Sequence, residues 1–147
     1  HLRGAWAGLA WKHSAGHLYR AILESVALEY GIYRDIVGQL NPELAFREIR
    51  VTGGGEKSNV WNQLKADALQ LDVVQLTREE GAPLGSALLA GFGAGVFDDL
   101  PAAASVWVQT GRRYTPNRDL GNYYRARREA YRRLLDTLHD WTDKNTT

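Results

Sequence analysis

Apolar residues recur at helical spacing over two long stretches of the chain. The first stretch begins after Ser14, a suitable N-cap, and Gly38 predicts where it stops. The second runs from about Asn117 to Trp141, and we expect the tail, residues 142–147, to be frayed. The pattern therefore predicts one long helix near each end of the chain.

Between these helices lie two short segments with strand character. Glu48 to Val51 alternates polar and apolar residues and continues into Gly53-Gly54-Gly55, and Val73 to Leu76 is rich in β-branched residues. A helical pattern over about 59–70 separates them, and Ser58 or Asn59 can cap it. This order favours a right-handed crossover and parallel strands.

The region after the second strand is less regular. Pro83 occupies the first-turn position of a third helix that is crowded with glycine and alanine. We expect a long irregular connection from Phe97 to Pro116, in which Pro101 opens a short helical turn. Two strands alone make a marginal sheet, so we also expect strands that belong before His1.

The length and charge of the chain are those of one ordinary globular domain. It has 147 residues and a formal net charge of +1, which gives no sign of a polyanionic partner. It contains no cysteine, so disulfides and thiolate chemistry are excluded and the compartment is unmarked. The chain starts at His1 and contains no methionine, which suggests a piece of a longer protein. Its apolar runs are too short to cross a membrane.

The triple glycine is the strongest candidate for chemistry. Bare backbone at the end of a strand, followed by a capped helix, can approach a phosphate or a ribose. The segment is not a Walker P-loop, because Glu56 directly precedes Lys57, and it lacks the third glycine of a dinucleotide fingerprint. Glycine-rich turns without a ligand are also common, so local physics leaves both interpretations open.

Three segments resemble one known family. Gly4-Ala5-Trp6-Ala7-Gly8-Leu9, seven further residues and then His17 to Glu24 are similar to the C-terminal signature of the FGGY carbohydrate kinases. The run Val51 to Gln63, followed by Asp67, is similar to the nucleotide-binding turn of that family. Ala82 to Gly91 resembles its small-residue helix, and the C-terminal helix matches only in pattern.

The resemblance implies an α/β fold of the actin-like ATPase (ribonuclease H-like) type, with residues 1–147 as a C-terminal, nucleotide-binding domain that lacks its first strands. It implies ATP and Mg²⁺ as cofactors, with backbone contacts from Gly54 and Gly55 to the phosphate and ribose side of the nucleotide. It places a polar nucleotide contact at Ser58 or Asn59.

The family places the sugar and the catalytic aspartate mainly in an N-terminal domain, so no catalytic residue is expected in this chain. We therefore expect the chain alone to be inactive. The implied reaction transfers the γ-phosphoryl group of ATP to a sugar, with a pentulose such as xylulose first and ribulose, glycerol or gluconate as alternatives. A non-catalytic actin-like assembly module is the alternative from another class. A cytoplasmic location is expected, and homo-oligomerisation is left open.

Four other features favour a structural interpretation. His13 and His17 are four residues apart, but no third metal ligand lies near them, so no metal site is expected. Acidic residues interrupt the arginines of the last helix, so we expect a solvated face and no nucleic-acid partner. Asp98-Asp99 is expected to start a turn, and Glu79-Glu80 to solvate a loop near the ligand.

Overall fold

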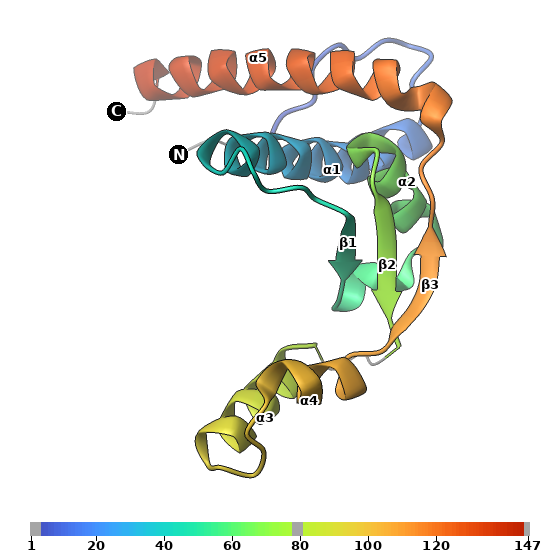
Figure 1. Cartoon of the computed structure of the whole chain (residues 1–147). Helices are drawn as coiled ribbons and strands as arrows, with labels where there is room; N and C mark the ends of the chain where they lie inside the picture. The colour runs from blue at the N-terminus through green and yellow to red at the C-terminus, as the bar shows by residue number, and fades with distance from the viewer. Residues whose placement is uncertain (1–3, 78–80, 146–147) are drawn as a thin grey trace. The chain divides into compact units, whose positions relative to one another are not determined.

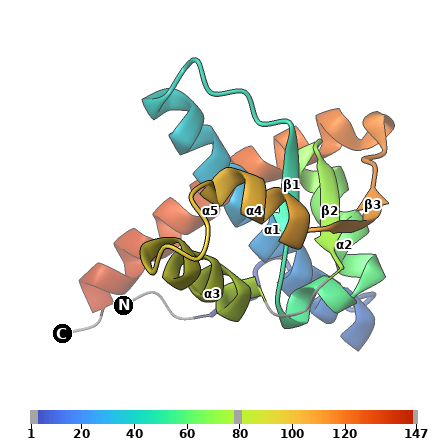
Figure 2. The same cartoon turned by 60° about the horizontal axis from the view of Figure 1, so that its bottom comes forward.

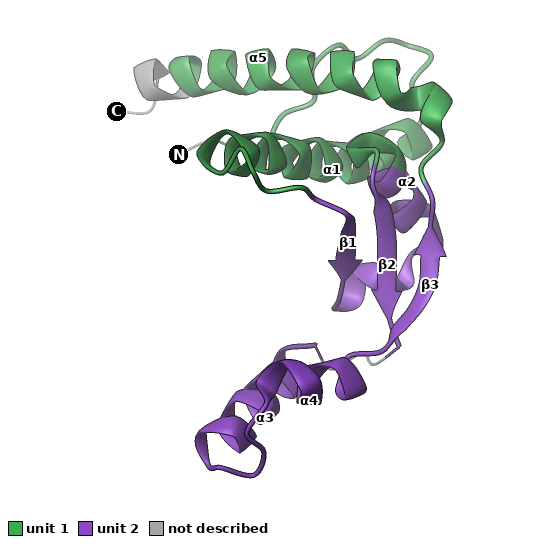
Figure 3. Cartoon of the chain, viewed as in Figure 1, with its two compact units in different colours: residues 1–45, 67–70, 116–147 green, residues 46–66, 71–115 purple. Residues whose placement is uncertain are grey.

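The computed structural model describes residues 4–77 and 81–145, and side chains as far as Trp141. The chain divides into two compact units (Figure 3). Unit 1 comprises residues 1–45, 67–70 and 116–147, and unit 2 comprises residues 46–66 and 71–115. Unit 2 is thus an insertion in unit 1, and the two are described separately below. Glu79 and Glu80 lie outside the described residues.

Unit 1 is built mainly from helix α1 (Ala15–Leu40) and helix α5 (Gly121–Asn145), which pack against each other (Figure 1). A short 3-10 helix, η2 (Arg118–Leu120), leads into α5. Ala27, Leu28 and Tyr124 are almost fully buried in this unit. Burial of these apolar side chains therefore stabilises this unit.

The ends of these helices correct the sequence-based expectation. Gly38 does not stop α1, which continues to Leu40 and ends where the Asn41 N–H bonds to the Val37 carbonyl. A single glycine costs a helix only about 1 kcal/mol, and Pro42 is the stronger barrier. The last helix also extends past its predicted end at Trp141, because α5 includes residues 142–145.

Unit 2 contains a three-stranded sheet in the order β1-β2-β3 (Figures 1 and 2). Strands β1 (Glu48–Val51) and β2 (Asp72–Leu76) are parallel and are joined through helix α2 (Asn59–Leu69), which confirms the predicted parallel pairing and the helix between the strands. Strand β3 (Thr110–Tyr114) is antiparallel to β2. The register places Ile49 opposite Val73 and Val73 opposite Tyr114. With Ala66, this row forms the apolar core of the sheet.

Strand β3 and the helix before it correct the expected irregular connection. Helix α4 (Leu100–Trp107) has Asp99 as its N-cap, whose Oδ1 accepts the Ala102 N–H at 2.8 Å, with Pro101 in the first turn. Helix α3 (Gly81–Gly93) begins two residues before the predicted Pro83. Residues 97–116 are therefore mostly regular structure. None of the helices in the described ranges is long and apolar enough to span a bilayer.

Candidate functional site

The three glycines at the end of β1 have three different surroundings in unit 2. Gly53 has φ 85°, in the left-handed region that favours glycine. Gly54 starts the 3-10 helix η1 (Gly54–Lys57), and a Cβ added to it would have no atom within 4 Å. A Cβ on Gly55 would lie 2.5 Å from the Cζ3 of Trp61. Gly53 and Gly54 therefore both leave space at which a ligand can reach bare backbone, and Gly54 does so without needing a positive φ, whereas Gly55 makes room for Trp61.

Ser58 and Asn59 already have partners within unit 2. The Ser58 Oγ accepts the Trp61 N–H at 3.2 Å, so Ser58 is the N-cap of α2. The Asn59 Oδ1 accepts the Tyr114 hydroxyl at 2.6 Å. Both residues are exposed, so the Ser58 hydroxyl proton and the Asn59 amide group can still face a ligand. The four predicted residues thus lie together at the turn and at the start of α2.

Sequence reasoning missed a buried polar cluster directly behind this turn. The Asn62 Nδ2 donates to the Glu56 carbonyl at 2.6 Å, and the Lys65 Nζ donates to the Asn62 Oδ1 at 3.2 Å. Glu56 is 2% exposed, and its Oε2 has no hydrogen-bond partner among the described residues. The available signal was the spacing of Asn62 and Lys65, which puts two polar residues on one face of α2.

Lys65 is the positive charge of this cluster. Its Nζ lies 4.0 Å from the centroid of the Trp61 ring, within cation–π distance. Burial lowers the pKa of Lys65, and the nearby Glu56 carboxylate opposes that shift. The Lys65 ammonium therefore helps to hold the Trp61 ring against Gly55. The conformation of the turn thus depends on a charge that is buried behind the turn.

The start of α3 lies against the end of β1. A Cβ on Gly81 would collide with the Thr52 Oγ1, so these two segments approach closely. The carboxyl ends of parallel strands are the usual place for ligands in α/β sheets. The glycine turn and the first residue of α3 thus share the edge of the sheet where a ligand is expected.

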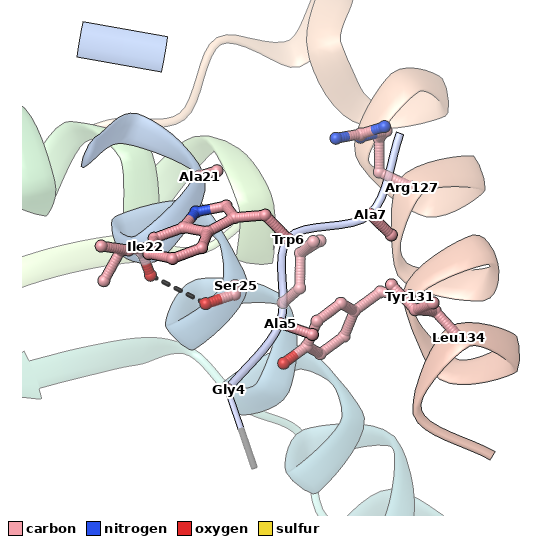
Figure 4. A pocket seen from close by; sticks show the side chains of 11 residues that line it. Gly4, Ala5, Trp6, Ala7, Ala21, Ile22, Ser25, Arg127, Tyr131 and Leu134 are labelled. Atoms are coloured by element: carbon pink, nitrogen blue, oxygen red, sulfur yellow. Dashed lines mark hydrogen bonds between the residues drawn. The ribbon is translucent and has the colours of Figure 1, made fainter. Parts of the chain in front are cut away.

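Unit 1 contains a largely apolar cavity of about 420 Å³ (Figure 4). The first half of the FGGY-like signature contributes Trp6, and the second half contributes Ile22. Tyr131 of α5 also lines the cavity, and burial raises the pKa of its hydroxyl. The two halves of the signature therefore meet on one cavity, next to the Ser25 hydroxyl that donates to the Ile22 carbonyl at 2.8 Å.

The histidine pair near the start of α1 takes part in local capping. The His13 Nδ1 accepts the Ala10 N–H at 3.0 Å, and the His17 Nδ1 accepts the Ser14 N–H at 3.1 Å. Each ring thus accepts a backbone N–H through one of its nitrogens. The centroids of the two rings lie 5.6 Å apart. Within residues 4–77 and 81–145, no three metal-ligating side chains come together.

Comparison with known proteins assigns the chain to a family. Residues 1–94 match the model of the C-terminal domain of the FGGY family of carbohydrate kinases. The xylulose kinase of Staphylococcus epidermidis RP62A is 27% identical over 99% of this chain and 28% of its own length. The glycerol kinase of Citrifermentans bemidjiense is 36% identical over 89% of this chain and 25% of its own length.

Solved structures show the same fold. The xylulose kinase of Rhodospirillum rubrum has a TM-score of 0.77 and 33% identity over 94% of this chain and 27% of that one. The glycerol kinase of Plasmodium falciparum, solved with ADP, is 18% identical with a TM-score of 0.75, over 93% of this chain and 27% of that one, and shows the fold alone.

The fold is that of the actin-like ATPases, which the FGGY kinases share. The chain belongs to the FGGY family of carbohydrate kinases. It spans about 28% of the length of the xylulose kinase from S. epidermidis.

Proposed function

We propose that this chain supplies part of the ATP site of a carbohydrate kinase, which transfers the γ-phosphoryl group of ATP to a sugar hydroxyl. The observation that carries the proposal is the open backbone at Gly54, directly after β1 and before the capped helix α2. Family membership supports the reaction class.

In this proposal each predicted residue has a defined role. Gly54 lets the nucleotide phosphates approach the main chain, and Gly55 allows the Trp61 ring to pack against the turn. The Ser58 hydroxyl and the Asn59 amide, both exposed beside the turn, supply polar contacts to the nucleotide. The bound nucleotide brings the transferable phosphoryl group, and these residues bind and orient it.

For the acceptor we propose a pentulose such as xylulose. Two observations support this choice: the identity of 33% to the R. rubrum xylulose kinase, and alignment with the S. epidermidis xylulose kinase over 99% of this chain. Glycerol is the second candidate, because several glycerol kinases are 31–37% identical to this chain. Parallel assays with xylulose, ribulose, glycerol and gluconate decide between them.

We further propose that residues 1–147 act as the C-terminal domain of a longer cytoplasmic enzyme whose other domain binds the sugar and carries the catalytic base. No ligand set for magnesium gathers in the described ranges, so in this proposal Mg²⁺ would enter with the nucleotide and would not be held by side chains of this chain. Purified chain alone should not phosphorylate any of the four acceptors, and ATP-dependent phosphorylation above background would contradict this division of roles.

The decisive test is Gly54→Val in the whole enzyme. We expect the KM for ATP to rise far more than the KM for sugar, with a loss of about 2 kcal/mol or more in kcat/KM for ATP. The matched control is Gly93→Val in α3, since Gly93 also has open space around its Cβ position. An unchanged KM for ATP in Gly54→Val would refute the nucleotide role.

A further inference from the structure

A polar cavity of about 370 Å³ in unit 1 is lined by four arginines from three elements. Arg34 comes from α1, Arg118 from η2, and Arg125 and Arg128 from α5. Among the described residues no carboxylate lines the cavity, and its remaining polar side chains are the amides of Gln70 and Asn122. Residues far apart in the sequence thus place four positive charges around one hollow.

Three of the four guanidinium groups are held in place by the protein. The Arg118 Nη1 donates to the Gln70 carbonyl at 3.0 Å, and Arg34 donates to the Leu69 carbonyl. The Arg128 Nε donates to the Asp35 Oδ2 at 2.9 Å, and its chain packs on Gly31, where a Cβ would lie 2.7 Å from the Arg128 Cδ. The cavity is therefore pre-organised.

Several donors are left over after these contacts. Arg125 has no hydrogen-bond or ion-pair partner within the described part of the chain. Asp35 forms ion pairs with two members of the group, Arg34 and Arg128. Because guanidinium groups stay protonated at all ordinary pH values, the cluster keeps an excess of positive charge.

We infer that this cavity binds the phosphate group of a small metabolite. Guanidinium forks match the oxygens of phosphate, and ordered donors around a pocket favour a small anion over an extended one. The volume exceeds that needed by one phosphate and suits a small phosphate monoester. Binding relieves the mutual repulsion of the four arginines, so it also stabilises unit 1.

The other arginines of α5 distinguish this site from a general basic surface. Arg127 lies 3.6 Å from the Glu24 carboxylate and lines the apolar cavity instead. Arg132 and Arg133 are exposed and line neither cavity. Arg125→Gln therefore removes a lining charge, whereas Arg132→Gln and Arg133→Gln remove equally exposed charges from the same helix and serve as matched controls.

The test is calorimetric titration of the full protein with inorganic phosphate and with glycerol 3-phosphate, at fixed ionic strength. We expect saturable binding that weakens about tenfold in Arg125→Gln, as for one lost charge-assisted hydrogen bond, and that stays unchanged in the two control variants. Tighter binding of glycerol 3-phosphate identifies a monoester as the ligand, and equal binding identifies phosphate itself.

Arg118→Gln provides a second variant on a different element, and a circular-dichroism melt of each variant checks its folding. Gly54→Val should leave this binding intact, so failure here and failure of the nucleotide proposal are distinguishable. Three results would each overturn the inference. The first is an equal loss of phosphate affinity in Arg125→Gln, Arg132→Gln and Arg133→Gln. The others are tighter binding to duplex DNA than to phosphate, and the absence of saturable binding.

Discussion

The Tyr114 hydroxyl donates a hydrogen bond to the Asn59 Oδ1 at 2.6 Å, which ties the last strand of the sheet to the first residue of α2. Tyr114 is 4% exposed, and its ring belongs to the core formed by Ala66 and Val73. The bond fixes the orientation of the Asn59 side chain. The helix start that follows the glycine turn is therefore positioned by a residue that lies 55 positions further along the chain.

Tyr114→Phe should destabilise the protein by about 1 kcal/mol, the usual net value of one hydrogen bond. Asn59→Ala should cost a similar amount, and the double variant should cost little more than either single one. Urea unfolding of the four proteins measures this coupling. Additive effects would show that the two side chains do not interact.

Gly55→Ala should destabilise unit 2 by about 1–3 kcal/mol, because the added methyl group overlaps the Trp61 ring. The same change at Gly54 should alter the melting temperature far less. Trp61→Leu removes the overlap, so Gly55→Ala should cost less in that background. An equal cost in both backgrounds would point to the main chain of the turn instead of the ring.

Lys65→Met should destabilise the protein by about 2 kcal/mol or more, because it leaves the Glu56 carboxylate buried without its nearby positive charge. Adding Glu56→Gln should recover part of that loss. Chemical denaturation of the two single variants and the double variant tests this relationship. A double variant as unstable as the sum of both changes would refute the pairing.

Stability should fall as the pH rises from about 10 to about 12. Burial, followed by the nearby Glu24 carboxylate, raises the pKa of Tyr124 from 10.0 to about 12. The unfolded chain therefore loses this proton first, and its contribution to stability is complete below pH 10 and lost as the pH passes the folded value. Tyr124→Phe should show a shallower alkaline decline in melting temperature, and a decline as steep as that of the wild type would assign the effect to other groups.

The parallel pair of strands was predictable because β1 and β2 contain β-branched residues next to clear turn signals. Strand β3 was not, because only Tyr114 of its five residues is buried. Its position depends on distant partners: Arg113 donates to Asp72 and to Glu48, each at 2.8 Å. The small residues of α4 likewise show no periodicity that would separate a helix from a loop.

The candidate site was predictable only as a segment. A run of three glycines indicates open backbone. It does not show that Gly55 packs against Trp61 while Gly54 keeps open space around it. That distinction depends on the Trp61 ring and on Lys65 beside it. The arginine cavity was missed because its members come from residues 34 to 128, and spacing within α5 alone suggested a solvated face.

The insertion of unit 2 into unit 1 determines the order in which the chain can fold during synthesis. Helix α1 leaves the ribosome before its packing partner α5, which is made only after the whole of unit 2. At the usual rate of translation, the apolar face around Ala27 and Leu28 therefore stays exposed for roughly several seconds before α5 can pack on it. During that interval the apolar face of α1 is open to non-native contacts, and every residue inserted into unit 2 lengthens the interval.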